Sequence, residues 1–210
     1  MNQEMIDHYP VLHQEFNSVV LDIPKIEPDD WDLWWKFWNE NKQVMTKVYP
    51  SHNSGPGLQR WEGIQIVNEG NIFEDPWDIQ TIECRHLFPN MFKLLDNIPM
   101  DIKRIRAVTS TGSFKPHTDH RFDYLSLRVM FYDNNPGPTF YYVNNNRSVE
   151  FQKLPETSNT WIYKDQTRLH GSYHIPKHEK ILFMIFGKWR STELQEVVDR
   201  SLVKYKDYCQ

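Results

Sequence analysis

The sequence predicts a mainly β protein with flanking helices, whose core is an antiparallel sandwich or barrel. Three observations carry this prediction. Short strand-like segments follow one another between residues 102 and 188, clusters of turn-forming residues separate them, and amphipathic helical patterns lie on either side. Evenly spaced short strands with turn residues between them are typical of antiparallel sandwiches and barrels. The expected result is an all-β core covered by helices.

The core strands are expected where β-branched and aromatic residues gather between turns. The predicted ranges are 102–109, 124–132, 139–143, 148–151, 160–163 and 180–188, and two more strands are expected at 18–23 and around 61–67. In the range 124–132, apolar residues alternate with a second set of residues that includes the charged Arg128. One face of that strand is therefore expected to be apolar, while the other carries a charge.

Helices are predicted before and after this core. The segment 28–30 is a helix-start signal, and the tryptophans that follow it form one helical stripe: Trp31, Trp34, Trp35 and Trp38. Such a stripe is typical of a helix face that packs against a sheet, so core packing is expected rather than a ligand platform. A second helix is predicted over 89–97. A third begins at Ser191, with Thr192 and Gln195 as a capping box.

The 210 residues are expected to form one domain, because no repeat, low-complexity tract or linker divides them. Residues 1–100 are expected to be a supporting region of helices and strands. Residues 101–190 would form the β core, and residues 191–210 the C-terminal helix. The sequence pattern changes near residue 100, where the succession of predicted strands begins.

The composition excludes several classes of protein. With 24 Lys and Arg against 28 Asp and Glu, the net charge is −4, and both signs are mixed along the chain, so nucleic-acid binding is not expected. The longest apolar run, 181–186, is too short for a membrane helix. The first twenty residues do not resemble a secretory signal, which predicts a cytoplasmic protein. Cys84 and Cys209 are expected to be reduced thiols.

The candidate chemistry lies among the histidines, since the sequence has no phosphate loop, GxSxG, GxGxxG or HExxH motif. His117 and Asp119 are two residues apart, so in an extended segment both project to one side and can bind one ion. The candidates for a third ligand are His120, His170, His174 and His178. His170 is preferred because it follows a polar turn and precedes a glycine. Two histidines and one carboxylate leave open positions suited to iron(II) chemistry.

This pattern resembles a known family. The stretch 109–119, the motif His117-x-Asp119 with His170 further along, and a basic residue ten positions after His170 resemble the iron(II) and 2-oxoglutarate dependent oxygenases. Within them, the segments 116–118 and 127–129 are most similar to the aspartyl/asparaginyl β-hydroxylase branch. The resemblance covers about residues 102–188. It implies a double-stranded β-helix, which is a jelly-roll or cupin-like barrel. It also implies an enzyme that uses dioxygen and 2-oxoglutarate to hydroxylate an aliphatic C–H bond.

The resemblance also implies roles for particular residues. His117, Asp119 and His170 would bind iron(II), and Lys180 would pair with the far carboxylate of 2-oxoglutarate. Arg128 is the alternative residue for that carboxylate. Arg121 and Arg168 are candidates to hold a carboxylate of the substrate. The expected substrate is a small molecule, an amino acid or a peptide, and the oligomeric state stays open.

Two other functions fit the same residues. One is a cupin-like enzyme that uses its metal for a non-oxidative reaction. The other is a non-enzymatic, aromatic-rich β-barrel that binds a peptide or a sugar, in which the histidines have no role. Iron content and succinate formation separate the three hypotheses.

Overall fold

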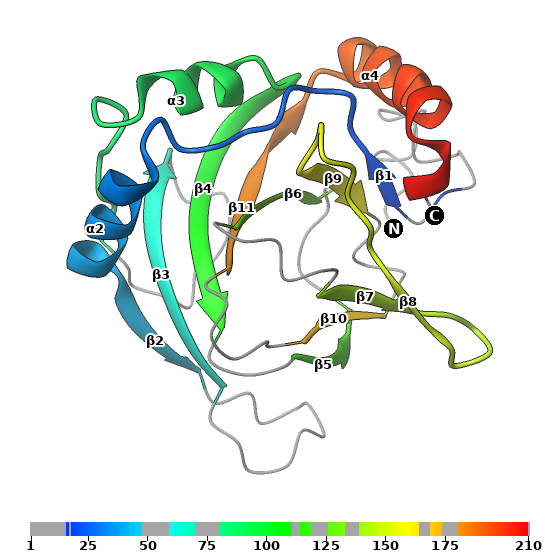
Figure 1. Ribbon diagram of the computed structural model, residues 1–210, viewed down its shortest axis with the longest axis horizontal. Coiled ribbons are helices and arrows are strands. Elements are labelled where there is room, and N and C mark those ends of the chain that lie inside the picture. The colour runs from blue at the N-terminus through cyan, green and yellow to red at the C-terminus, as the bar shows by residue number, and fades with distance from the viewer. Residues whose placement is uncertain are drawn as a thin grey trace.

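The computed structural model describes residues 16, 18–47, 59–69, 80–110, 114–118, 126–132, 139–163, 169–173 and 180–209. Within these residues the chain forms two β-sheets, one of seven strands and one of four, in which every pair of neighbouring strands is antiparallel. Helices cover one side of the larger sheet (Figure 1). The prediction of a mainly β, antiparallel protein with flanking helices is therefore confirmed.

The larger sheet has the strand order β1-β9-β6-β11-β4-β3-β2, and the smaller sheet has the order β5-β10-β7-β8. The strands are β1 Ser18–Val20, β2 Gln43–Lys47, β3 Gln59–Asn68, β4 Met100–Ser110, β5 Phe114–His117, β6 Ser126–Tyr132, β7 Phe140–Val143, β8 Val149–Phe151, β9 Thr160–Tyr163, β10 His170–Ser172 and β11 Lys180–Trp189. From β4 onward the chain passes repeatedly between the two sheets. Strands β4, β6, β9 and β11 belong to the larger sheet, and β5, β7, β8 and β10 belong to the smaller one.

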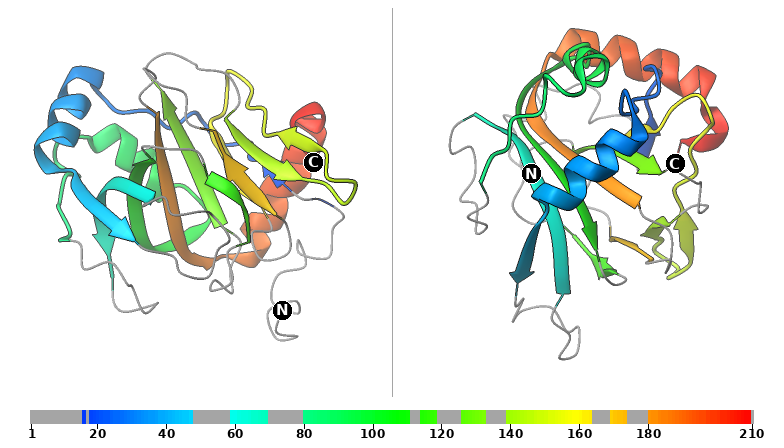
Figure 2. Two further views of the ribbon diagram at one scale, coloured as in Figure 1. Left: turned by 90° about the horizontal axis from the view of Figure 1, so that it is seen from below. Right: turned by 60° about the vertical axis from the view of Figure 1, so that its left-hand side comes forward.

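The larger sheet is strongly curved, and the smaller sheet lies opposite its concave side (Figure 1). Helices α2 (Trp31–Asn41), α3 (Pro89–Asp96) and α4 (Ser191–Lys204) lie on the convex side, and a short 3-10 helix, Lys206–Tyr208, follows α4. The two further views in Figure 2 show the same layers of helices, larger sheet and smaller sheet. None of the helices in the described ranges is long and apolar enough to cross a membrane.

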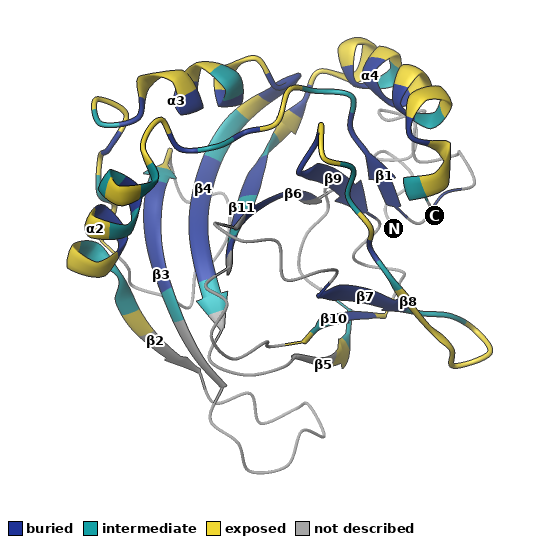
Figure 3. Ribbon diagram, viewed as in Figure 1, coloured by how far each residue is buried: buried dark blue, intermediate teal, exposed yellow. Residues whose placement is uncertain are grey.

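The main hydrophobic core lies between the convex side of the larger sheet and the helices. Trp34 of α2 is fully buried there, with its ring centroid 6.0 Å from that of Phe131 and 5.5 Å from that of Phe183. Trp38 is buried too, while Trp31 and Trp35 are partly buried against the same core. The prediction that the tryptophan stripe packs against a sheet is confirmed. Figure 3 shows the resulting pattern, with buried strands and helices exposed on their outer sides.

Two aspartates just before α2 accept hydrogen bonds from the first turns of two helices, α2 and α3. The Asp30 side chain caps α2 by accepting a hydrogen bond of 2.9 Å from the Leu33 backbone N–H. Helix α3 has no side-chain cap of its own. Instead, the Asp29 carboxylate accepts hydrogen bonds from the backbone N–H groups of Asn90 and Met91, each of 3.0 Å. One aspartate pair therefore fixes the start of both helices.

The C-terminal helix begins where the sequence predicts, but its predicted capping box is wrong. Helix α4 starts at Ser191, its N-cap is Arg190, and no side chain makes a capping hydrogen bond. Because Thr192 already lies inside the helix, its hydroxyl is not at the capping position. Gln195 instead donates to Asp199, one turn further along the helix, at 2.7 Å.

The strand predictions are mostly correct. The six core strands are confirmed with ends that differ by at most two residues, whereas β1 stops at Val20, three residues before the predicted end. Strands β2, β5 and β10 were not predicted as strands. Cys84 and Cys209 are free thiols, as expected. Burial raises the pKa of Cys84 to about 12, so this thiol stays protonated at neutral pH.

Candidate active site

The concave side of the larger sheet differs in chemistry from its convex side. Along β6, Leu127, Val129 and Phe131 belong to the convex-side core, so the alternating residues Arg128 and Met130 face the concave side. The predicted alternation of this strand, with one apolar face and one charged face, is confirmed. The concave side looks toward the smaller sheet, and this sheet carries the two predicted histidine ligands.

His117 and His170 lie directly opposite each other on neighbouring strands. His117 ends β5, His170 begins β10, and the two residues are paired in the antiparallel register. Their ring centroids are 4.5 Å apart, and their ring planes are inclined by 53°. Residues opposite each other in a sheet project their side chains to the same face. The fold therefore brings together two imidazoles that are far apart in the sequence.

Aromatic rings surround His170. The side chain is 2% exposed, the ring of Phe140 stacks on it at 5.6 Å, and the ring of Tyr163 meets it edge-on at 5.0 Å. Phe140 comes from β7, next to β10, whereas Tyr163 comes from β9 in the larger sheet. These contacts hold the imidazole in one orientation and keep water from its two sides. His117 is only partly buried, so the histidine pair has one sheltered and one more accessible member.

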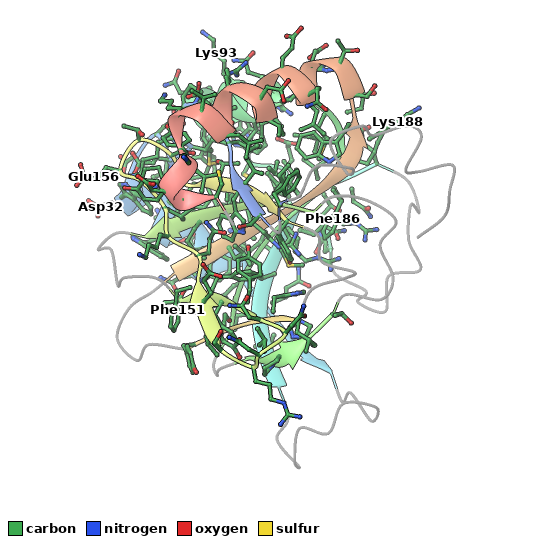
Figure 4. The ribbon with its side chains drawn as sticks, turned by 90° about the vertical axis from the view of Figure 1, so that its right-hand side faces the viewer. Asp32, Lys93, Phe151, Glu156, Phe186 and Lys188 are labelled. Carbon is green, nitrogen blue, oxygen red and sulfur yellow. The ribbon has the colours of Figure 1, made fainter. Side chains whose placement is uncertain are left out.

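Arg128 contacts Tyr163, and the ring of Tyr163 packs against His170. Its guanidinium Nη2 donates a hydrogen bond of 2.9 Å to the Tyr163 hydroxyl, and its Nη1 donates to the Leu127 carbonyl at 3.3 Å. The guanidinium carbon lies 5.2 Å from the ring centroid of Tyr163 and 5.7 Å from that of Phe186. Figure 4 labels Phe186 inside the molecule, in contrast to Lys188 at the periphery. Because a guanidinium stays protonated in proteins, a buried positive charge lies one side chain away from His170.

Two further buried arginines lie on the concave side, and the sequence analysis did not single them out. Arg104 and Arg106 of β4 alternate with Ile105 and Ala107, which belong to the convex-side core. Arg106 Nη2 donates to Gln65 Oε1 at 2.9 Å, and Arg104 donates to Asn68 Oδ1 at 3.4 Å. Arginines two positions apart in a predicted strand share one face, and this spacing was the available signal.

Several of the predicted site residues lie outside the described residues. These are Asp119, Arg121 and Arg168, together with His120, His174 and His178. Lys180 is described in its backbone, which pairs with that of Tyr132 at the start of β11, while its side chain is outside the description. Among the described residues, no group of three His, Cys, Asp or Glu side chains could hold a metal ion. The predicted third ligand, Asp119, is not among the residues so described.

The histidine pair has a geometry that fits two ligands of one metal ion. Imidazoles that bind an octahedral ion at right angles, each through a nitrogen about 2 Å from it, have ring centres roughly 4.5 Å apart. The observed separation is 4.5 Å. The aromatic contacts of His170 add the fixed ring orientation that metal-binding histidines need. The separation of the two rings therefore matches that of two histidine ligands of one ion.

Comparison with known proteins gives little further information. No protein-family model and no curated protein matches the chain. Among the solved structures similar to it is an oxidoreductase of the 2OG-Fe(II) oxygenase family from Burkholderia pseudomallei. The two share 13% sequence identity with a TM-score of 0.42, over 89% of this chain and 94% of that chain. A TM-score below 0.5 does not establish a common fold.

Proposed function

We propose that this protein is an iron(II) and 2-oxoglutarate dependent dioxygenase that hydroxylates an aliphatic C–H bond of a small molecule, an amino acid or a peptide. The observation that carries the proposal is the His117–His170 pair. Its ring separation of 4.5 Å suits two ligands of one octahedral ion, and the pair lies beside a buried arginine. In this proposal Asp119 is the third ligand, because it follows His117 by two residues.

We also propose that the fold is a double-stranded β-helix, which the resemblance to these oxygenases implies. The strand order supports it: β4-β11-β6-β9 within the larger sheet and β5-β10-β7-β8 in the smaller one. Each sheet holds four of the eight strands, and consecutive strands mostly alternate between sheets, as in a jelly roll. The histidines occupy adjacent strands of the smaller sheet and face the interior between the sheets.

Each described residue of the site has a part in this chemistry. Iron(II) would supply the redox chemistry that activates dioxygen. His117 and His170 would hold the ion, and the rings of Phe140 and Tyr163 would keep the His170 imidazole oriented and dry. The Arg128 guanidinium would bind the distal carboxylate of 2-oxoglutarate, since its planar fork matches a carboxylate and Tyr163 fixes its position. Lys180 is the second candidate for this carboxylate, ten residues after His170.

The substrate residues proposed from the sequence are Arg121 and Arg168. Both flank a predicted ligand, and each could pair with a carboxylate of an amino acid or a peptide end. Their substitution by Gln should weaken the response to such substrates without affecting iron binding. No nucleic-acid substrate is proposed, since the chain has a net charge of −4.

The first experiment measures metal binding. Anaerobic titration of the purified protein with iron(II), followed by calorimetry, should give one ion per chain. His117→Ala, Asp119→Ala and His170→Ala should each abolish stoichiometric binding. His86→Ala, which changes an exposed histidine on another part of the chain, is the matched control and should bind normally. Circular dichroism checks that the His170 variant is folded, because that side chain is buried.

The second experiment measures the reaction. With iron(II), 2-oxoglutarate and oxygen, the protein should release succinate, and a pool of amino acids and peptides should increase the rate and yield products heavier by one oxygen atom. Iron binding without succinate release would favour the cupin-like, non-oxidative enzyme. If the wild-type protein bound no iron, the binding-module hypothesis would be favoured and the proposal would be wrong.

A further inference from the structure

The residues of the proposed site come from both sheets. His117 and His170 belong to the smaller sheet. The two candidates for the distal carboxylate of 2-oxoglutarate, Arg128 of β6 and Lys180 of β11, belong to the larger sheet. A 2-oxo acid with one end at the iron and the other end at either cation would therefore bridge the two sheets. The separation of the sheets would then have to suit the length of that acid.

Aromatic rings from both sheets meet beside His170. The ring centroid of Tyr163, in the larger sheet, lies 5.3 Å from that of Phe140 and 6.1 Å from that of Tyr142, both on β7 of the smaller sheet. It lies 5.0 Å from that of His170. All four side chains are buried. Because packed interiors resist compression, these rings set how closely the sheets can approach each other.

The C-terminal segment, residues 205–209, is attached to the larger sheet. Strand β1 ends the strand order of that sheet, and the C-terminus lies beside it (Figure 1). Tyr205 is 5% exposed and packs in the same hydrophobic cluster as Val20 of β1. One turn earlier, in α4, the Ser201 hydroxyl accepts a hydrogen bond of 2.7 Å from the backbone N–H of Asp22, just after β1. The segment is therefore fixed to this edge of the larger sheet.

The same segment is hydrogen-bonded to the smaller sheet through Gln152. This residue directly follows β8, which ends the strand order of the smaller sheet. Its Nε2 donates to the Tyr208 carbonyl at 3.1 Å and to the Lys153 carbonyl at 2.8 Å. Its Oε1 accepts a hydrogen bond of 3.0 Å from the hydroxyl of Tyr142, the residue paired with His170 in the strand register. The C-terminal segment therefore links the edges of the two sheets.

Burial makes this link effective. Gln152 is 3% exposed and Tyr142 is fully buried, so water does not compete for their hydrogen bonds. Breaking the link would leave buried polar groups without partners, which is costly. The aromatic rings thus limit the approach of the sheets, and the link limits their separation.

We propose that the C-terminal segment, through Gln152 and Tyr142, fixes the separation of the two sheets and thereby selects the chain length of the 2-oxo acid. This inference rests on the function proposed above, and it holds whether Arg128 or Lys180 binds the distal carboxylate, since both lie in the larger sheet. Gln152 and Tyr142 are positioning residues in this proposal. They should favour 2-oxoglutarate over 2-oxoadipate, which is longer by one methylene group.

Iron binding separates this role from a general effect on stability. His117 and His170 lie on adjacent strands of one sheet, so their spacing is set by the pairing of β5 with β10 and not by the distance between the sheets. Loosening the link should therefore change the choice of 2-oxo acid and leave iron binding intact. A general loss of structure would reduce both.

The test measures binding of two 2-oxo acids. The protein is loaded anaerobically with iron(II), and the dissociation constants of 2-oxoglutarate and 2-oxoadipate are determined by calorimetry. The wild-type protein should prefer 2-oxoglutarate by at least about tenfold, because one methylene group changes binding by roughly 10- to 200-fold in a site of fixed size. Equal binding of the two acids by the wild-type protein would overturn the proposal.

Two variants loosen the link. Tyr142→Phe removes only the hydroxyl that donates to Gln152, and Gln152→Met keeps the length of the side chain but removes its hydrogen bonds. In each variant the preference for 2-oxoglutarate should fall by about three- to tenfold, while the dissociation constant of iron(II) should change less than about twofold. Tyr141→Phe is the matched control. It removes a hydroxyl from the same strand, on the opposite face, where the ring packs against Tyr173, and it should keep the wild-type preference.

The outcomes distinguish the inference from the proposed function. If Gln152→Met does not fold, as judged by circular dichroism, Tyr142→Phe decides, because it lacks a single oxygen atom. An unchanged preference in the folded variants would overturn the inference. An equal loss of iron and 2-oxo acid binding would overturn it too, since the link would then only stabilise the fold. A wild-type protein that bound neither iron nor 2-oxoglutarate would contradict the proposed function itself, and this result is visible before any variant is compared.

Discussion

The two faces of the larger sheet are built from the same strands and have opposite chemistry. On the convex face, Phe131 and Phe183 pack under Trp34 in an apolar core. On the concave face, one residue away in the sequence, the strands carry buried arginines that face the smaller sheet. Since side chains alternate along a strand, one segment can contribute stability through one face and binding through the other. Substitutions on the two faces should therefore have separable effects.

The largest effect is expected on the convex face. Phe131→Ala removes a buried ring whose centroid lies 4.2 Å from that of Phe183 and should lower the free energy of unfolding by about 3 to 5 kcal/mol. The measurement is urea denaturation followed by tryptophan fluorescence. Val203→Ala, at an 83% exposed position, should change stability by less than about 0.5 kcal/mol. Iron binding by the folded variant should be unchanged, and a large loss of it would mean that the two faces are not separable.

The concave face should give the opposite result. Arg128→Met replaces a buried cation with an apolar side chain, so it removes the charge that would bind a carboxylate. It should weaken 2-oxoglutarate binding by about 2 to 4 kcal/mol and leave iron binding intact. Lys180→Met, measured beside it by anaerobic calorimetry, identifies which residue binds the distal carboxylate. If neither variant weakens 2-oxoglutarate binding, the cosubstrate is bound elsewhere.

Tyr163→Phe sharpens the comparison within the concave face. The substitution removes only the hydroxyl that accepts a 2.9 Å hydrogen bond from Arg128, and it keeps the ring that packs against His170. A hydrogen bond to a charged group contributes about 1.5 kcal/mol, so 2-oxoglutarate binding should weaken by about that amount. Iron affinity, measured by the same anaerobic titration, should not change. A parallel loss of iron binding would show that the hydroxyl also supports the histidine pair.

The elements that could be predicted from the sequence are those with a strong periodic pattern. Strand β6 shows strict alternation, and its ends were located to within two residues. Helix α2 shows a tryptophan stripe behind a helix-start signal, and its start was predicted correctly. Strands β5 and β10, which carry the histidines, were missed as strands. They are four and three residues long, and β5 includes Pro116, which lacks an N–H group. Such strands form because partners are present, and β5 is an edge strand, where proline is tolerated.

The candidate site was predicted only in part for the same reason. The polar turn before His170 and the glycine after it favoured this residue over the other candidate histidines, but only the register of β5 and β10 places the two rings side by side. Arg104 and Arg106 were missed because a charged residue in a strand is usually a solvated one, and nothing in the sequence indicates which side of the sheet is enclosed. That information depends on the smaller sheet, which forms from distant segments.

The smallest effect is expected at the helix layer that covers the convex face. Asp29→Ala removes the carboxylate that accepts hydrogen bonds from the first turn of α3 without changing any buried apolar residue. Loss of a helix N-terminal cap costs about 1 kcal/mol, so the urea midpoint should fall by a correspondingly small amount. Asp29→Asn, which keeps only one of the two accepting oxygens, should recover part of the loss. Because α3 is separated from the histidine pair by the larger sheet, iron and 2-oxoglutarate binding should be unaffected. A change in either would mean that the convex layer shapes the site through the strands and does more than stabilise them.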